Sequence, residues 1–293
     1  NMVYGAAGAG VRAMTSSSSP GISLKQEGIS YIAGAELPCV IVNIMRGGPG
    51  LGSIQPSQTD YFQATRGGGN GDYRLVVLAP ANVQELVDLI IEGFDIADQY
   101  RNPVMILGDG MIGQMMEPIE FKKPKQRELP EKTWATTGTK GERKPNIINS
   151  LYLAAEELEK HNIKLQAKYK EIQENEVKVE SYNIKDADVV IAAYGTTSRI
   201  ARTAISQLEK EGYKVGLIRP ITLWPYPYDE FKKINENCKG ILTVEMNTGQ
   251  MIDDVKIAVE GKFPVYFHGR TGGMVPTPAE IIEKVKAIYG GEL

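Results

Sequence analysis

The chain has 293 residues, of which 42% are hydrophobic and 24% are charged, and its formal net charge is −3. At about 150 residues per domain, this length predicts two globular domains, and the apolar content excludes a disordered chain. The chain has no excess of basic residues and so lacks the positive face of a nucleic-acid-binding protein. No apolar run reaches the roughly 18 residues of a membrane span.

The first block, residues 1–118, alternates helix-like and strand-like stretches. The run at 38–45 is apolar almost without interruption, which is typical of a parallel strand covered on both faces. Apolar residues at 82–100 recur at helical spacing. This alternation predicts an α/β domain with a parallel sheet and helices on both faces. The other expected helices lie at 1–10 and 22–34, and the other strands at 11–15, 74–79 and 103–107.

Residues 119–185 break this pattern. They begin with a segment rich in proline, lysine and glutamate, which predicts a linker. A charged helix is expected at 147–180, either bridging the domains or exposed. A second α/β domain is expected over residues 186–293. Its predicted strands lie at 188–195, 214–218, 240–245 and 264–267, and its helices at 197–211, 253–259 and 278–289.

Neither the cysteines nor the histidines indicate a metal site. Cys39 and Cys238 are far apart and lack further ligands at suitable spacing, which also argues against a disulfide framework and fits a cytoplasmic protein. His161 is expected to face solvent on the charged helix, and His268 lies at a strand end. Two isolated histidines support neither a metal centre nor a catalytic triad.

A run of hydroxyl side chains lies where the first strand ends and the next helix begins. Ser17, Ser18, Ser19 and Pro20 are its central residues. Ligands of open α/β sheets bind outside the carboxyl ends of strands, so these residues are candidates for contact with a polar ring or an anion. A multi-serine helix cap, with proline in the first turn, explains the same run equally well. The spacing matches neither a phosphate-binding P-loop nor a dinucleotide fingerprint.

Arg46 directly follows the buried strand at 38–45 and opens a glycine-rich loop. Its planar guanidinium suits bidentate capture of a carboxylate at the edge of the sheet where substrates bind. The alternative is a structural salt bridge at the strand end. The polar residues at 55–60 complete this loop, and any one of them could simply be solvated.

Two further motifs follow predicted strands. Gly108-Asp109-Gly110 begins like the magnesium motif of thiamine-diphosphate enzymes, but the asparagine expected about 25–30 residues later is missing, so a strand-end turn is favoured. The segment at 245–250 could face the first domain, another subunit or a ligand. The turn that starts a helix is the favoured interpretation for each of its residues.

Taken in order, these residues resemble one known family. The stretches AMTS at 13–16, SPG at 19–21, QEG at 26–28, ELPCV at 36–40 and RGGP at 46–49 are similar to the alpha subunit of 2-oxoacid:ferredoxin oxidoreductases. YRNPV at 100–104, VEMN at 244–247 and GRTGGMVPTP at 269–278 fit the same family. The 2-ketoisovalerate (3-methyl-2-oxobutanoate) branch is the most similar.

The resemblance implies separate roles for the parts of this chain and for its partner subunits. Residues 1–118 would be an N-terminally truncated pyrimidine-binding domain, 119–185 a linker and charged helix, and 186–293 a transketolase C-terminal-like domain. Thiamine diphosphate would lie between this chain and a beta subunit that carries the diphosphate and magnesium motif. Gamma and ferredoxin-like subunits would hold iron–sulfur clusters, coenzyme A would be a substrate, and ferredoxin would accept the electrons.

The resemblance also implies roles for the candidate residues. Arg46 matches the family arginine that holds the carboxylate of the 2-oxoacid. Ser17, Ser18, Ser19 and Pro20 fall where the family's loop lines the aminopyrimidine pocket. The family's pyrimidine-contacting glutamate and substrate-contacting threonine are expected upstream of Asn1, and Glu27 does not match that glutamate's position. The implied reaction is oxidative decarboxylation of a branched-chain 2-oxoacid to an acyl-CoA.

Two other functions stay open at this point. A nucleotide-dependent oxidoreductase on Rossmann-like domains is disfavoured by the missing phosphate fingerprint. A non-catalytic scaffold subunit would use its charged helix and C-terminal domain only to assemble a complex, and it would tolerate replacement of Arg46.

Overall fold

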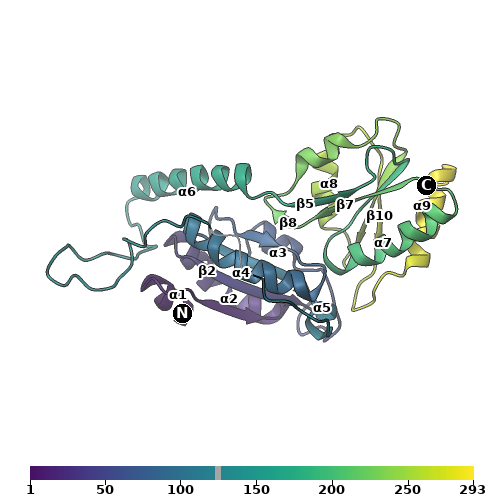
Figure 1. The fold of residues 1–293 in the computed structure, drawn as a ribbon. Coiled ribbons are helices and arrows are strands. Elements are labelled where there is room, and N and C mark those ends of the chain that lie inside the picture. The colour runs from purple at the N-terminus through teal and green to yellow at the C-terminus, as the bar shows by residue number, and fades with distance from the viewer. Residues whose placement is uncertain (123–126) are drawn as a thin grey trace.

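Two sheets of five strands each form the frame of the chain over residues 1–122 and 127–293, which are the residues that the computed structural model describes (Figure 1). Each sheet carries helices, and the two α/β halves lie side by side. This arrangement confirms the predicted α/β class.

The first sheet has the strand order β1-β2-β4-β3-β8. Its first four strands are parallel, and β8 runs antiparallel to β3. The strands are β1 (Met14–Ser17), β2 (Cys39–Met45), β3 (Val76–Leu78), β4 (Pro103–Asp109) and β8 (Thr222–Trp224). Strand β8 was not predicted. It belongs to the first sheet although its residues lie in the C-terminal third of the chain.

The central strands explain why the first sheet forms. All seven residues of β4 are buried, as are six of the seven in β2, because helices cover both faces of these strands. The helix that packs on them, α4, begins after Asn82, whose side chain accepts a hydrogen bond from the Glu85 N–H at 2.8 Å. The helices of this half are α1 (Met2–Gly8), α2 (Ser19–Gly34), α3 (Tyr61–Thr65), α4 (Val83–Tyr100) and α5 (Gly110–Gln114).

The charged helix is shorter than predicted. Helix α6 covers Ala155–Asn175 and lies along the first half, packing Leu165, Tyr169 and Ile172 into its core (Figure 1). The expectation of a helix from residue 147 is wrong. The Asn149 side chain accepts a hydrogen bond from the Leu151 N–H at 2.9 Å, a local bond that competes with helix formation.

The second sheet has the order β10-β9-β6-β7-β5. Strands β6, β7, β9 and β10 are parallel, while β5 is antiparallel to β7 and was missed in the sequence. The strands are β5 (Val179–Tyr182), β6 (Val189–Ala192), β7 (Val215–Pro220), β9 (Gly240–Glu245) and β10 (Val265–Gly269). The helices are α7 (Gly195–Lys210), α8 (Met251–Val259), α9 (Pro278–Gly290) and the 3₁₀ helix η1 (Tyr228–Lys233).

Within the described part of the chain, no helix combines the length and the apolar character needed to cross a bilayer.

Candidate functional site

The serine run and Arg46 lie next to each other at one edge of the first sheet. Strands β1 and β2 are parallel neighbours, and their pairing ends with Ser17 opposite Asn43. Immediately beyond, the Ser19 hydroxyl accepts a hydrogen bond from the Arg46 backbone N–H at 3.0 Å and donates one to the Arg46 carbonyl at 3.3 Å. The structure therefore brings together the two features that the sequence singled out.

The serines differ in what their hydroxyls do. Ser18 occupies the N-cap position of α2, yet its side chain makes no capping hydrogen bond. Among the described residues, neither Ser17 nor Ser18 makes a side-chain hydrogen bond, and both are half-buried together with Pro20. Gly21 packs so close that a Cβ there would lie 2.0 Å from the Ser17 Oγ. A helix cap alone does not explain this run of hydroxyls.

The Arg46 side chain has no acidic partner in the described part of the chain. It is half-buried, it makes no ion pair or side-chain hydrogen bond there, and its Nε is buried without an acceptor. The structural salt bridge considered as an alternative is therefore not found among these residues. A half-buried guanidinium with no acidic partner suits an anionic ligand, which would bind its terminal nitrogens.

The loop that begins at Arg46 folds back as a narrow hairpin. Arg46 forms an isolated antiparallel bridge with Pro56, and the Gly47 N–H donates to the Gln55 carbonyl at 3.0 Å. Gly52 has φ +57°, and a Cβ there would lie 1.7 Å from the Gly47 oxygen, so only glycine fits this turn. The hairpin brings the chain after Arg46 back to the sheet edge.

A recess of about 340 Å³ lies beside this hairpin. It is bounded by the hairpin, by the start of α5 and by the loop between β10 and α9. None of its lining residues carries a charge. They are Gln55, Pro56, Gly110, Met111, Gln114, Met115, Gly273 and Val275.

Gln58 fastens the far end of the same loop to the second half of the chain. Its side chain is fully buried, donating to the Tyr194 carbonyl at 2.9 Å and accepting from the Met246 N–H at 2.9 Å. Its own carbonyl accepts from the Asn247 side chain at 2.8 Å. Local sequence patterns did not distinguish Gln58 from the other polar residues at 55–60, because its partners lie more than 130 residues away along the chain.

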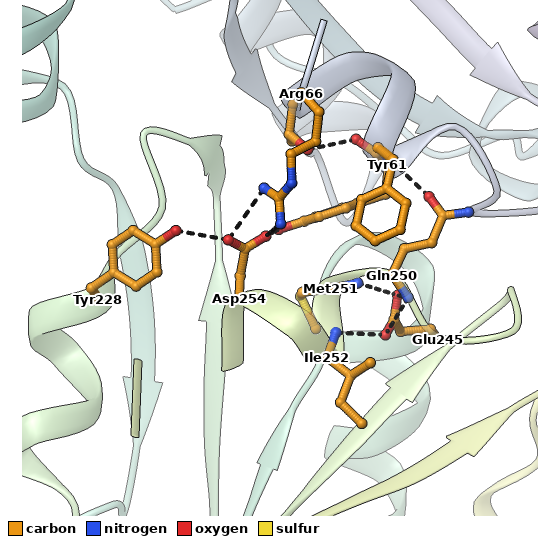
Figure 2. Close-up of polar contacts among 10 residues, drawn as sticks. Tyr61, Arg66, Tyr228, Glu245, Gln250, Met251, Ile252 and Asp254 are labelled. Carbon is orange, nitrogen blue, oxygen red and sulfur yellow. Dashed lines mark hydrogen bonds and ion pairs between the residues drawn. The ribbon is translucent and has the colours of Figure 1, made fainter. Parts of the chain in front are cut away.

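The segment at 245–250 combines two of the roles considered for it. The fully buried Glu245 carboxylate accepts hydrogen bonds from the N–H groups of Met251 at 2.8 Å and Ile252 at 3.0 Å, at the start of α8 (Figure 2). Burial raises the pKa of Glu245. The favoured helix-turn role is confirmed for Glu245, whereas Met246 and Asn247 face the first half through Gln58.

The Gly108-Asp109-Gly110 motif is the strand-end turn predicted from the sequence. Asp109 ends β4 and caps α5, accepting from the N–H groups of Met111 at 2.9 Å and Ile112 at 3.3 Å. Burial raises the pKa of Asp109. Over residues 1–122 and 127–293, no cluster of three or more His, Cys, Asp or Glu side chains could hold a metal ion.

Neither histidine lines the recess or forms a hydrogen bond with Arg46. The expectation that His161 faces solvent is wrong, since its Nε2 lies 2.7 Å from the Gly34 carbonyl and its ring stacks on Tyr152. The cause is that α6 packs against the first half instead of standing free. His268 is largely covered, and this burial lowers its pKa.

Two family matches cover almost the whole chain. Residues 1–186 match the thiamine-diphosphate-binding part of pyruvate flavodoxin/ferredoxin oxidoreductases, and residues 187–281 match core domain II of pyruvate:ferredoxin oxidoreductases. The chain belongs to the pyruvate flavodoxin/ferredoxin oxidoreductase family. This confirms the family resemblance, the thiamine-diphosphate-enzyme fold and the assignment to an oxidoreductase.

Relatives within this oxidoreductase family differ in their named substrates. The ketoisovalerate oxidoreductase subunit VorB of Methanothermobacter thermautotrophicus is 49% identical over 99% of this chain and 82% of its own length. The 2-oxoglutarate synthase subunit KorA of Methanothermobacter marburgensis is 34% identical over 97% of this chain and 82% of its own length.

Solved structures agree with the fold. The 2-oxoglutarate:ferredoxin oxidoreductase of Magnetococcus marinus, with 2-oxoglutarate, coenzyme A and succinyl-CoA bound, superposes with a TM-score of 0.82 at 26% identity. That match covers 98% of this chain and 55% of the solved chain, so this chain spans about half of it. A split-gene transketolase shares only the fold, with a TM-score of 0.61 at 15% identity over 99% of this chain and 79% of that one.

Proposed function

We propose that this chain is the alpha-type subunit of an oxidoreductase that converts 2-ketoisovalerate to its acyl-CoA by oxidative decarboxylation, with ferredoxin as electron acceptor. The observation that carries the proposal is the Arg46 guanidinium, which has no acidic partner among the described residues and lies beside the serine run. The 49% identity to a ketoisovalerate oxidoreductase subunit supports the choice of substrate.

In this proposal the residues at the sheet edge have separate roles. Arg46 holds the carboxylate that leaves as carbon dioxide, in the bidentate geometry that guanidinium and carboxylate share. Ser17, Ser18, Ser19 and Pro20 line the aminopyrimidine of thiamine diphosphate. Two of these hydroxyls are without protein partners among the described residues, which fits a polar ring beside them. Thiamine diphosphate, when bound, supplies the nucleophilic carbon and the electron sink for decarboxylation.

The remaining components are proposed to lie on other polypeptides. A beta subunit carries the diphosphate and magnesium motif, while gamma and ferredoxin-like subunits carry the iron–sulfur clusters and coenzyme A enters as the acyl acceptor. Residues 1–118 act as the pyrimidine-binding domain, 119–185 as the linker and charged helix, and 186–293 as the transketolase C-terminal-like domain. The assembled enzyme is cytoplasmic.

The recess beside the Arg46 hairpin supports an aliphatic substrate. Its lining contains methionine, valine and proline side chains together with two glutamines, and no charged residue. An uncharged branched side chain loses little on entering such a surface, whereas the second carboxylate of 2-oxoglutarate would be desolvated against a lining that contains no charged residue. We therefore propose that this recess receives the side chain of the 2-oxoacid.

The test uses the complex reconstituted with its partner subunits and ferredoxin. Arg46→Ala should raise KM for 2-ketoisovalerate and lower kcat/KM by about 100-fold, the effect of losing a charged contact of about 3 kcal/mol. Arg143→Ala, in the exposed linker, is the control and should leave both unchanged. The wild-type complex should prefer 2-ketoisovalerate to 2-oxoglutarate.

Three outcomes would contradict the proposal. Unchanged kinetics in Arg46→Ala would leave a scaffold role for this chain. Reduction of NAD without ferredoxin would favour a nucleotide-dependent enzyme. A preference for 2-oxoglutarate would remove the proposed role of the uncharged recess.

A further inference from the structure

We infer that Ser19 is a positioning residue, which fixes the backbone of Arg46 and thereby aims its guanidinium. This inference rests on the proposed role of Arg46 in carboxylate binding. It gives Ser19 a second function, besides the proposed contact with the cofactor, that Ser17 and Ser18 do not share.

The first observation is that one hydroxyl binds both backbone polar groups of Arg46. The Ser19 Oγ accepts from the Arg46 N–H at 3.0 Å and donates to the Arg46 carbonyl at 3.3 Å. A serine hydroxyl has a single proton to donate. With that proton directed to Arg46, Ser19 retains only acceptor capacity for any ligand.

The second observation is where Arg46 stands in the sheet. The pairing of β2 with β1 ends at Asn43, and its pairing with β4 ends at Met45. Arg46 is thus the first residue beyond both ladders. On the side of β1, where the ladder has ended, the Ser19 hydroxyl forms hydrogen bonds with the Arg46 backbone. The bridge between Arg46 and Pro56 holds the hairpin that follows.

The third observation is the support of Ser19 itself. It is the first residue of α2 and only 9% exposed, and its neighbours Ile22 and Gln26 on the same helix are buried. The side chain therefore extends from a packed helix. Gly47, which follows Arg46, has no side chain to hold the backbone in place. Without the Ser19 hydrogen bonds, the Arg46 backbone would be held only by the hairpin contacts on its other side.

This geometry links a small displacement to a loss of substrate binding. The Arg46 side chain starts between the two peptide groups that Ser19 holds. A shift of about 1 Å at such a point can cost one to two orders of magnitude in rate when it misplaces a group that orients the substrate. Ser19→Ala removes both bonds and leaves the rest of α2 unchanged.

The experiment compares Ser19→Ala, Ser19→Thr and Ser23→Ala in the reconstituted complex. Ser19→Ala should raise KM for 2-ketoisovalerate by about 10-fold, with a smaller effect on kcat. Ser19→Thr keeps the hydroxyl and should restore most of the affinity. Ser23→Ala removes an exposed hydroxyl of α2 that bonds to the Ser19 carbonyl but not to Arg46, and it should behave as wild type.

A double variant shows whether Ser19 acts through Arg46. In the Arg46→Ala background, adding Ser19→Ala should change KM no further, because the group that Ser19 positions is already gone. Independent effects that multiply would overturn the inference. Weaker binding of thiamine diphosphate by Ser19→Ala, with KM unchanged, would also overturn it and leave Ser19 with its proposed cofactor contact alone.

A crystal structure of Ser19→Ala separates this inference from the proposed function. The Arg46 backbone should move or become mobile relative to β2, whatever the complex catalyses. An unmoved Arg46 would refute the positioning role even if 2-ketoisovalerate is the substrate. A wild-type complex that oxidises no 2-oxoacid would instead refute the proposed function, while a displaced Arg46 would still support the structural part of the inference.

Discussion

At the scale of single residues, Asp254 joins the two halves of the chain. Its carboxylate accepts hydrogen bonds from the hydroxyls of Tyr61 at 2.6 Å and Tyr228 at 2.7 Å, and it pairs with Arg66 at 3.1 Å (Figure 2). Tyr61 and Arg66 come from the first half, while Asp254 and Tyr228 come from the second. The Asp254 side chain is 1% exposed, and burying its carboxylate would cost free energy without these partners.

Removing one hydroxyl from this cluster should lower stability measurably. Tyr61→Phe deletes a buried hydrogen bond to a charged group, worth about 1.5–3 kcal/mol. The midpoint of thermal unfolding should fall by about 2–5 °C. Tyr182→Phe is the matched control, because its hydroxyl bonds to Glu209 at the surface. Equal midpoints for the two variants would contradict the importance of the buried cluster.

At the scale of elements, two lysines hold α6 against the first half. Lys164 and Lys168, one turn apart on α6, both pair with the Glu36 carboxylate at the end of α2. Burial alone would raise the pKa of Glu36, but the Lys164 hydrogen bond and the nearby positive charges outweigh burial and lower it. Burial lowers the pKa of Lys168 to about 8.

The lowered pKa of Glu36 predicts a pH-dependent contribution to stability. Because the folded value lies below the ordinary value of 4.5, the contribution is complete above that pH and is lost as the pH falls through the folded value. Glu36→Gln should therefore destabilise the protein by about 1–2 kcal/mol at pH 7. The difference from wild type should shrink below about pH 4.5.

Hydrogen exchange over α6, combined with urea unfolding at pH 7 and below pH 4.5, measures this effect. Glu159→Gln, an exposed position on the same helix, serves as the control. A gap between wild type and Glu36→Gln that stays constant with pH would show that the ion pairs do not hold the helix.

At the scale of the whole molecule, the two halves are joined by a shared sheet and by side-chain hydrogen bonds. Strand β8 leaves the second half to pair with β3 of the first sheet. Arg219 of the second half forms two hydrogen bonds of 2.8 Å with Glu85 at the start of α4. Gln58 adds its buried bonds to Tyr194 and Met246.

The effect of Gln58 on the interface can be isolated with a variant of similar size. Gln58→Met should leave the Met246 N–H buried without its partner, at about 1–3 kcal/mol, while the Tyr194 carbonyl keeps its hydrogen bond from the Thr197 hydroxyl. We expect a lower midpoint of thermal unfolding and faster proteolysis between the halves. Gln166→Ala, which removes an exposed amide that bonds to Asp72, should change neither. A variant as stable as wild type would show that other contacts carry the interface.

Local patterns in the sequence were enough for the main elements and for the location of the candidate site. The continuous apolar runs of β2 and β4 predict buried parallel strands, because both faces of such strands must be covered. The same reasoning predicts the position of Arg46, because a charged residue directly after a buried strand lies at the sheet edge. The family resemblance came from motifs spread along nearly the whole chain.

The tertiary structure alone decided the contacts between distant segments. Strand β8 has three residues and its partner strand precedes it by more than 140 positions, so no local pattern marks it. The bond from Ser19 to Arg46 and the burial of Gln58 also arise only when separate segments meet. A periodic pattern records which face of an element is buried, whereas the identity of a hydrogen-bond partner depends on how the elements are placed in space.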